Sequence, residues 1–310
     1  MAPVNETPFY GYGIGGRAHH LTAATIVLTI LAFLLVANRL FWRIKLMNYL
    51  GFDDVFIIIA FLSLMVLGAI MLLAVTHGYG RASSELSPSD HLFAMKMFWI
   101  SQVLYKVTMN FTKLSLASVY LRLFEKRWVR RTLWTMIGFV SLYGITSIGI
   151  TIFQCRPMRR AFDKSTPGHC INNTAFWYAN GLYNIVTDFV ITAVAVAALP
   201  ELHISKKSKA ALGSLFGLGM FVIAASILRM ATLKPSSTSK DLSYGTLTST
   251  TWSVVEASLA VVCACVPNLR APLNRLFPRL LALRTVTNSQ QDNIPLRVMA
   301  APAGVIADDE

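Results

Sequence analysis

Apolar residues in this chain gather into seven long, continuous stretches. The stretches run over residues 21–41, 55–75, 97–120, 133–153, 176–199, 211–233 and 251–266. A bilayer core about 30 Å thick needs roughly 20 apolar residues in an α-helix, and hydrocarbon forces each backbone amide to be satisfied within its own segment. Continuous runs also differ from the alternating pattern of a membrane β-barrel. The pattern therefore predicts an all-α, polytopic membrane protein with a bundle of seven transmembrane helices.

Composition agrees with a bilayer environment, because 55% of the residues are hydrophobic and only 14% are charged. Ordinary water-soluble domains carry more polar surface than this. The connectors between the apolar stretches are short and leave no room for a soluble domain. We therefore expect an N-terminal segment over residues 1–20, a transmembrane domain over 21–277 and a tail over 278–310 whose composition is typical of disorder.

The orientation in the membrane follows from the basic residues of the connectors. Residues 1–20 lack the apolar core of a cleavable secretory signal, so the first helix is expected to act as the targeting signal. Most connector lysines and arginines fall on one side of the predicted membrane, among them Arg39, Arg43, Arg122, Arg130 and Lys206. The positive-inside rule predicts that this side, with the C-terminus, is cytosolic and that the N-terminus is outside.

The formal net charge of +13 is explained by orientation and by attraction to anionic lipids. The basic residues are scattered over the connectors and do not form one groove with interleaved aromatic residues. Nucleic acid is therefore not an expected partner, whereas the lipid bilayer is.

Four cysteines form two pairs along the sequence. Cys155 and Cys170 share a connector that the charge pattern places outside, in an oxidising compartment, and a disulfide there is expected to contribute about 3 kcal/mol. Cys263 and Cys265 lie in the seventh apolar stretch and are interpreted as small buried apolar residues.

Glycosylation sequons begin at Asn5 and Asn172, both on the predicted outer side. A third begins at Asn110, inside an apolar stretch, and we expect it to stay unmodified. The first two support the topology and predict a glycoprotein.

Ionisable residues inside the apolar stretches are the most informative side chains for function, because each costs roughly 2.5–3.5 kcal/mol at the centre of a membrane helix. They are Lys106, Lys113, Asp188, Arg229 and Glu256. Similar depths in the membrane predict two ion pairs, Lys113 with Asp188 and Arg229 with Glu256. The pairs could simply neutralise one another and fix the order of the helices.

Alternatively, the same residues line a polar pocket. Lys106, Asn110 and Lys113 share one face of their helix, and Asn180, Asn184 and Asp188 share one face of another. The candidate pocket residues are Lys106, Asn110, Lys113, Asn180, Asn184, Asp188, Arg229, Trp252 and Glu256. If the protein is catalytic, Lys113, Asp188 and Glu256 are the candidate acid and base groups, since burial shifts pKa values of such groups toward neutrality.

Two carboxylates, Asp53 and Asp54, begin the second apolar stretch. Carboxylates favour the positive end of a helix dipole, so we interpret them as capping residues. The histidines have no zinc-site spacing, and the chain has no nucleophile elbow or phosphate-binding Walker loop, so no metal site, hydrolase or ATP-driven pump is expected.

Several motifs, taken in order, resemble those of the fungal rhodopsin-domain family of seven-helix integral membrane proteins, the group that includes a protein of the satratoxin gene cluster. The matching segments are Gly51-Phe52-Asp53-Asp54, His77-Gly78-Tyr79-Gly80, Lys113-Leu114-Ser115, Tyr120-Leu121-Arg122, Cys155-Arg156-Pro157, Cys170, Asp188, Leu199-Pro200, Arg229, Trp252, Glu256, Pro267 and Leu269-Arg270. The resemblance covers residues 21 to 275, and the ordered set is more specific than any single motif.

The resemblance implies seven helices, an outer N-terminus and a role either in sensing or in secondary-metabolite gene clusters. It implies no retinal cofactor here, because the Schiff base needs a lysine in the seventh helix and this stretch has none. We therefore expect a multi-pass protein of the plasma membrane or an endomembrane, without a cofactor, that accommodates an apolar small molecule of fungal secondary metabolism. The alternative is a receptor-like sensor that couples to a G protein; a transporter is less favoured because no inverted repeat is visible.

Overall fold

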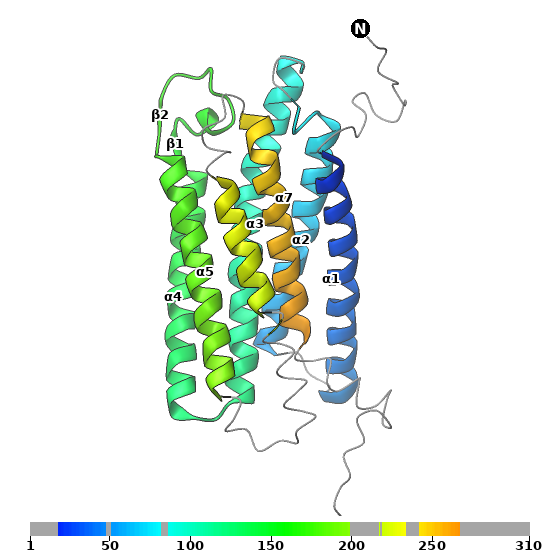
Figure 1. The fold of residues 1–310 in the computed structure, drawn as a ribbon, viewed down its shortest axis with the longest axis vertical. Helices are drawn as coiled ribbons and strands as arrows, with labels where there is room; N and C mark the ends of the chain where they lie inside the picture. Colours follow the sequence, from blue (N-terminus) through cyan, green and yellow to red (C-terminus); the bar gives the residue numbers. More distant parts are fainter. Residues whose placement is uncertain are drawn as a thin grey trace, which may run out of the picture.

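The computed structural model describes residues 18–47, 51–81, 86–198, 217, 219–233 and 242–266. Within these residues seven α-helices stand side by side in one bundle (Figure 1). They are α1 (Ala18–Met47), α2 (Phe52–Thr76), α3 (Pro88–Leu123), α4 (Arg127–Ile152), α5 (Asn173–Ala198), the helix Gly219–Leu233 and α7 (Leu242–Cys265). Each of the seven predicted stretches overlaps one of these helices, so the prediction of an all-α seven-helix bundle is confirmed.

Five of these helices, α1, α2, α4, α5 and α7, are long and apolar enough to cross a membrane. Helix α3 is longer, with 36 residues, but it carries more polar side chains. It occupies the middle of the bundle, where it packs against α2, α4, α5 and α7, whereas α1 packs against α2 and α7. The most polar helix therefore has the most helical neighbours, which shield its polar groups.

The surface of the bundle is apolar, as expected for lipid contact. Large hydrophobic side chains on several helices are exposed, including Val27 on α1, Ile145 on α4 and Phe189 on α5. The buried core instead combines small and large apolar residues, such as Ala60 and Leu64. A water-soluble bundle would bury its large apolar residues, so this distribution fits a protein that is surrounded by hydrocarbon.

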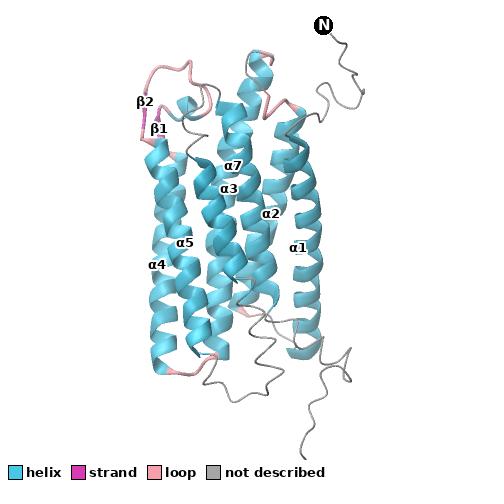
Figure 2. Cartoon of the chain, in the orientation of Figure 1, coloured by secondary structure: helices cyan, strands magenta, loops and turns pink. Residues whose placement is uncertain are grey.

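One end of the bundle carries a small hairpin between α4 and α5 (Figure 2). Strand β1 (Cys155–Arg156) pairs antiparallel with β2 (His169–Cys170), and the 3-10 helix η2 (Met158–Ala161) lies in the loop between them. The predicted disulfide is confirmed, because Cys155 and Cys170 face each other in the strand register and are bonded. We call this the hairpin end.

At the hairpin end the connector after α2 forms a tight turn. Gly78 and Gly80 adopt φ values of 84° and 96°, a region that side chains other than glycine rarely enter. Tyr79 between them is buried, and its hydroxyl lies 2.9 Å from the Thr246 hydroxyl and 2.8 Å from that of Thr250, both on α7. Burial raises the pKa of Tyr79 to about 12, so the phenol stays neutral. The turn thus ties α2 to α7.

Some helices begin earlier than the hydrophobic pattern predicts. Helix α3 begins at Pro88, although the third apolar stretch begins at 97, and α7 begins at Leu242, although the seventh begins at 251. A helix continues past the hydrocarbon as long as its backbone hydrogen bonds are made. Turns outside the hydrocarbon can carry polar residues, which the hydrophobic pattern does not count. Residues 1–17, with Asn5, and residues 267–310, with the predicted tail, lie outside the described residues, as do Leu199 and Pro200.

The remaining cysteines and the second sequon lie within the described residues, and of the two cysteines predicted to be buried only Cys265 is fully so. Cys265 is buried and Cys263 half-buried, and both are free thiols. Asn172 is exposed just before α5, where its side-chain oxygen accepts a hydrogen bond from the Ala175 amide at 3.1 Å. Glycosylation of Asn5 and Asn172 stays a prediction.

The turn after α2 gives a first test. Replacing Gly80 by alanine should lower the thermal unfolding midpoint, because the new Cβ would lie 2.9 Å from a methyl carbon of Leu247 and the backbone conformation disfavours a side chain. The expected cost is about 1–2 kcal/mol. The matched control is Gly138→Ala on α4, where a Cβ meets no atom within 4 Å. Equal midpoints for the two variants in detergent would contradict the proposed strain.

Candidate functional site

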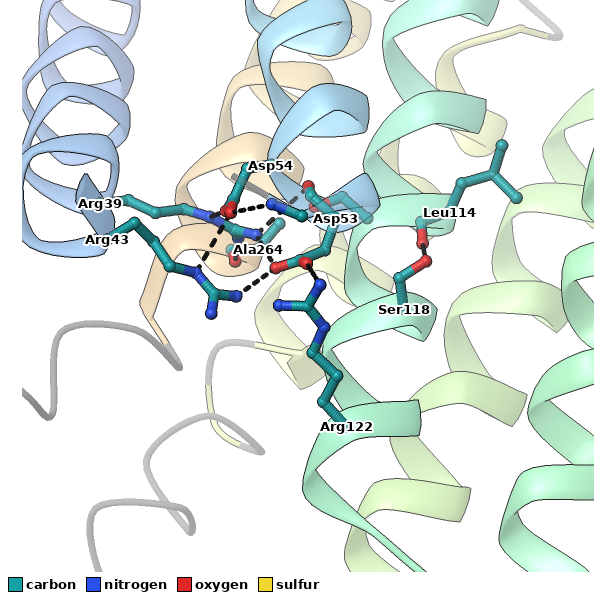
Figure 3. A network of polar contacts seen from close by, with 10 residues as sticks. Arg39, Arg43, Asp53, Asp54, Leu114, Ser118, Arg122 and Ala264 are labelled. Atoms are coloured by element: carbon teal, nitrogen blue, oxygen red, sulfur yellow. Dashed lines mark hydrogen bonds and ion pairs between the residues drawn. The ribbon is translucent and has the colours of Figure 1, made fainter. Parts of the chain in front are cut away.

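Five charged residues form a compact cluster at the end of the bundle opposite the hairpin end (Figure 3). They are Arg39 and Arg43 of α1, Asp53 and Asp54 of α2 and Arg122 of α3. We call them the aspartate–arginine cluster. Both carboxylates and Arg39 are buried, whereas the Arg122 side chain is 39% exposed.

Three arginines, from α1 and α3, pair with the two carboxylates of α2. Arg39 pairs with Asp53 at 2.9 Å and with Asp54 at 3.1 Å. Arg43 pairs with both aspartates: it contacts Asp53, and its Nε lies 3.2 Å from Oδ2 of Asp54. Arg122 reaches the second oxygen of Asp53 at 2.9 Å. Because Asp53 contacts arginines from α1 and α3, this single carboxylate joins three helices.

Backbone groups complete the cluster. Arg39 Nη1 donates to the Ala264 carbonyl of α7 at 2.7 Å, and the Ser115 hydroxyl of α3 donates to the Asp53 carbonyl at 2.7 Å. Buried charges are tolerated only when their remaining hydrogen-bonding groups are also satisfied. The cluster therefore fixes the relative positions of α1, α2, α3 and α7.

The interpretation of Asp53 and Asp54 as simple capping residues is only partly right. Asp54 does cap α2, because one of its oxygens accepts the Gly51 amide at 3.1 Å. Asp53 instead pairs with arginines, and both carboxylates are fully buried. A carboxylate that only caps a helix can stay exposed, whereas two fully buried carboxylates need cationic partners, and the neighbouring arginines supply them.

The sequence contained a signal that could have revealed the cluster. Arg39 lies inside the first apolar stretch, yet it was interpreted only as a residue that sets orientation. Arg39 and Arg43 are one turn apart on α1 and, when α1 and α2 pack as neighbours, face the start of α2. A buried Arg39 with 2% exposure needs an anion, and the two aspartates at the start of the next helix are close along the chain.

A second group of charges lies in the middle of the bundle and contains both predicted ion pairs. Lys113 Nζ lies 3.1 Å from Asp188 Oδ1, and Arg229 Nε lies 2.9 Å from Glu256 Oε2. Both predictions are confirmed. All four side chains are at most 13% exposed, so each charge is neutralised away from water.

The two ion pairs belong to one hydrogen-bonded network. Tyr105 donates to Glu256 at 2.7 Å, and Asn184 donates to the Tyr105 hydroxyl at 2.8 Å. Lys113 then donates to the Asn184 side-chain oxygen at 3.1 Å. The Ser226 hydroxyl also donates to Glu256. We call this the central network; Tyr105 and Ser226 were not identified from the sequence, because a hydroxyl in a membrane helix is common and carries no signal by itself.

The amide side chains of the two polar stripes lie beside this network. Tyr183 donates to the Asn110 oxygen at 2.9 Å and stacks on Tyr143 with ring centroids 3.6 Å apart. Tyr143 in turn donates to Asn180 at 3.2 Å. The stripes of α3 and α5 thus face the interior, and their amides bond mainly to neighbouring helices.

A pocket lies among α2, α3, α5, the helix Gly219–Leu233 and α7, in the half of the bundle nearer the hairpin end. It holds about 680 Å³ of empty space, including the part that opens to the exterior. Three predicted pocket residues line it, Lys106, Asn180 and Arg229. Apolar residues such as Leu67, Phe98 and Val254 form its walls, together with hydroxyl groups of α7.

The other predicted pocket residues lie elsewhere. Lys113 and Asp188 border a smaller cavity of about 380 Å³ deeper in the bundle, and Asn110, Asn184 and Glu256 are engaged in the contacts described above. Trp252 was placed wrongly: it borders a separate recess with His20 of α1. It lies four residues from Glu256, about 40° away on the helix, and packing of α1 against α7 decided which side it took.

The family motif residues at the helix ends have structural partners. His77 Nδ1 lies 3.0 Å from Asp90 Oδ1, which links the turn after α2 to the start of α3. Tyr120 is buried against Phe124 near the other end of α3. Together with Gly78, Gly80 and Arg122, these residues hold the connectors in place rather than lining the pocket.

Comparison with known proteins gives a clear family match. The family model described as the fungal rhodopsin domain matches residues 38–275. The matched segment includes the aspartate–arginine cluster, the central network and the pocket. No solved structure matches the chain.

Several curated fungal proteins are similar to this chain. A SAT4 family membrane protein of Emericella nidulans is 28% identical over 65% of this chain and 52% of its own length. The satratoxin biosynthesis SC1 cluster protein 4 of Stachybotrys chartarum is 31% identical over 56% of this chain and 63% of its own length. A polyenoic acids biosynthesis gene cluster protein of Metarhizium anisopliae is 26% identical over 88% and 77%. The chain thus matches about half to two thirds of the first two relatives.

The aspartate–arginine cluster predicts a strong effect for Asp53→Asn. The change leaves three arginines facing one carboxylate, so we expect a loss of about 3–5 kcal/mol in the free energy of unfolding. Thermal unfolding in detergent measures it. Glu125→Gln, at an exposed position between α3 and α4, is the matched control and should change stability by less than about 0.5 kcal/mol. Similar stability of the two variants would contradict the structural role of the cluster.

The Lys113–Asp188 pair predicts non-additive effects. Lys113→Met and Asp188→Leu should each destabilise the protein by about 3–5 kcal/mol, because each leaves an unpaired buried charge. The double variant should be more stable than the sum of the two losses predicts, since it removes both charges. A double-variant cycle measured by thermal unfolding tests the coupling, and strictly additive losses would show that the two side chains do not interact.

Proposed function

The chain belongs to the fungal rhodopsin domain family and is a multi-pass integral membrane protein, and on this premise we propose that it takes part in fungal secondary metabolism by accommodating an apolar small molecule in the pocket at the hairpin end. Two of the relatives described above carry names that refer to biosynthetic clusters, for satratoxin and for polyenoic acids. These names describe the relatives, and the proposal extends their common theme to this chain.

The pocket is the observation that carries the proposal. Small-molecule sites are concave and mostly apolar, with a few placed polar groups. This pocket has apolar walls and a small set of polar residues that includes Gln102, Lys106 and Arg229. The apolar walls of the pocket also resemble the bilayer interior in polarity, so an apolar molecule dissolved in the bilayer can bind there.

The contacts of the candidate catalytic groups favour a structural role over catalysis. Lys113, Asp188 and Glu256 each take part in an ion pair of the central network. Glu256 also accepts hydrogen bonds from Tyr105 and Ser226. A general acid or base needs access to a reacting atom, and these groups face one another. We therefore assign the central network to fixing the helices that surround the pocket.

The sensor alternative assigns signalling to a set of basic residues, Arg122, Lys126, Arg127, Arg130 and Arg131, together with the basic tail. In the structure Arg122 pairs with the buried carboxylate of Asp53, which gives it a structural role. The exposed basic residues Arg130 and Arg131 are explained by orientation in the membrane. Metabolism is therefore the function that we carry forward.

Deleting the gene in its native host should change the profile of extracted metabolites, and the unaltered gene should restore it. Complementation with Ser253→Phe should fail, because Ser253 lines the pocket and a phenyl group would fill it. The matched control is Thr248→Phe on the same helix, at an exposed position outside the pocket lining. Metabolites are compared by liquid chromatography with mass detection.

Two results would count against the proposal. An unchanged profile after deletion, with the protein normally expressed in the parent strain, would remove its link to metabolism. Full restoration by Ser253→Phe at normal expression would separate the metabolic role from the pocket.

A further inference from the structure

Lys106 differs from the other charged residues in the middle of the bundle. Its side chain lies on α3 and is buried, with a residue exposure of 7%. Its ammonium group donates to the Ser147 carbonyl of α4 at 3.4 Å and lies 3.9 Å from the centre of the Phe176 ring. Among the described residues, no carboxylate lies within ion-pair distance of this ammonium group.

The charges around the pocket therefore do not balance. Lys113 is matched by Asp188 and Arg229 by Glu256, so the four residues of the two pairs are neutral together. Lys106 adds one positive charge when its amine is protonated. An unmatched charge at membrane depth is costly. The cation–π contact with the ring and the hydrogen bond to one carbonyl compensate for this cost only in part.

Arg229 supplies a second donor at the same pocket. Its Nε is used in the ion pair with Glu256, but Nη2 is buried and has no hydrogen-bond partner among the described residues. Arg229 and Lys106 both line the pocket, from different helices. Arginine and lysine side chains that line one space are typical of a binding site for an anion.

The rest of the lining suits an apolar chain. Leu67 of α2, Phe98 of α3, Leu233 of the helix Gly219–Leu233 and Val254 of α7 border the same space. A ligand that satisfies both parts has an anionic head group and a hydrocarbon body. One unmatched positive charge is neutralised by one negative charge.

From these contacts we propose that the pocket binds an amphipathic monoanion, with a carboxylate as the fitting head group, and that Lys106 and Arg229 hold this head group while the apolar walls hold the chain. The inference rests on the proposed function and specifies the class of ligand. Free acids and anionic lipid head groups share this chemistry, and the experiment separates them.

Binding is measured on the full chain in nanodiscs of phosphatidylcholine, with radiolabelled dodecanoate and dodecanol as probes and empty nanodiscs as the background. Dodecanoate should bind more tightly than dodecanol by about tenfold or more, as expected for a charge-assisted hydrogen bond. Lys106→Met should remove this difference, whereas Lys106→Arg should keep it. Lys96→Met, at an exposed position of the same helix, is the matched control and should leave both affinities unchanged.

Nanodiscs that also contain phosphatidylglycerol identify the source of the anion. If this lipid competes with dodecanoate in the unaltered protein but not in Lys106→Met, the natural anion is a lipid head group. If it does not compete, a free acid is favoured. Both outcomes support the anion site.

The proposal is overturned if dodecanol binds as tightly as dodecanoate, or if Lys106→Met leaves the preference for the acid unchanged. Should Lys106→Met fail to fold, the comparison of acid and alcohol on the unaltered protein and on Lys106→Arg still decides. Failure of the broader function is distinguishable. If dodecanol and dodecanoate bind equally well and Ser253→Phe blocks both, the pocket binds small molecules without a preference for anions. If neither probe binds above background, the pocket itself is not a binding site for such molecules.

Discussion

Hydrocarbon cannot solvate a charge, and this constraint organises the interior of the protein. Every ionisable side chain inside the bundle must find its counter-charge or hydrogen-bond partners on another helix. The partners of each pair come from different helices. Arg229 and Glu256 come from the last two helices of the described bundle, whereas Lys113 and Asp188 come from α3 and α5. Matching charges across helices therefore specifies which helices are neighbours.

The charges are divided between two levels. The aspartate–arginine cluster lies at one end and joins α1, α2 and α3, with a backbone contact to α7. The central network lies nearer the hairpin end and joins α3, α5, α7 and the helix Gly219–Leu233. Helix α3 takes part in both, which explains why the most polar helix lies in the middle. Two clusters at different depths hold the bundle against both sliding and rotation of its helices.

This frame leaves two cationic side chains only partly satisfied next to the pocket. Most polar side chains in the interior are arranged so that they satisfy one another, and a pair of that kind has little to offer a ligand. Among the described residues, Lys106 has no carboxylate partner and Nη2 of Arg229 has no hydrogen-bond partner, and both residues line the pocket. Incomplete satisfaction of buried polar groups is expected at sites where a ligand completes the contacts. Buried charges that are already paired stabilise the structure, whereas those without a full set of partners are available to a ligand.

The sequence by itself determined the seven helices, the membrane environment, the Cys155–Cys170 disulfide and the two central ion pairs. Hydrophobic length, cysteine position and the depth of a charge along an apolar run are properties of the chain that lipid makes decisive. Tertiary structure alone decided which faces meet. It turned Arg39 from an orientation signal into a partner of Asp53, placed Trp252 beside α1, and separated Lys106, which lines the pocket, from Lys113, which does not. Rotation and tilt of a helix depend on all of its neighbours at once, and periodicity along one segment contains no information about them.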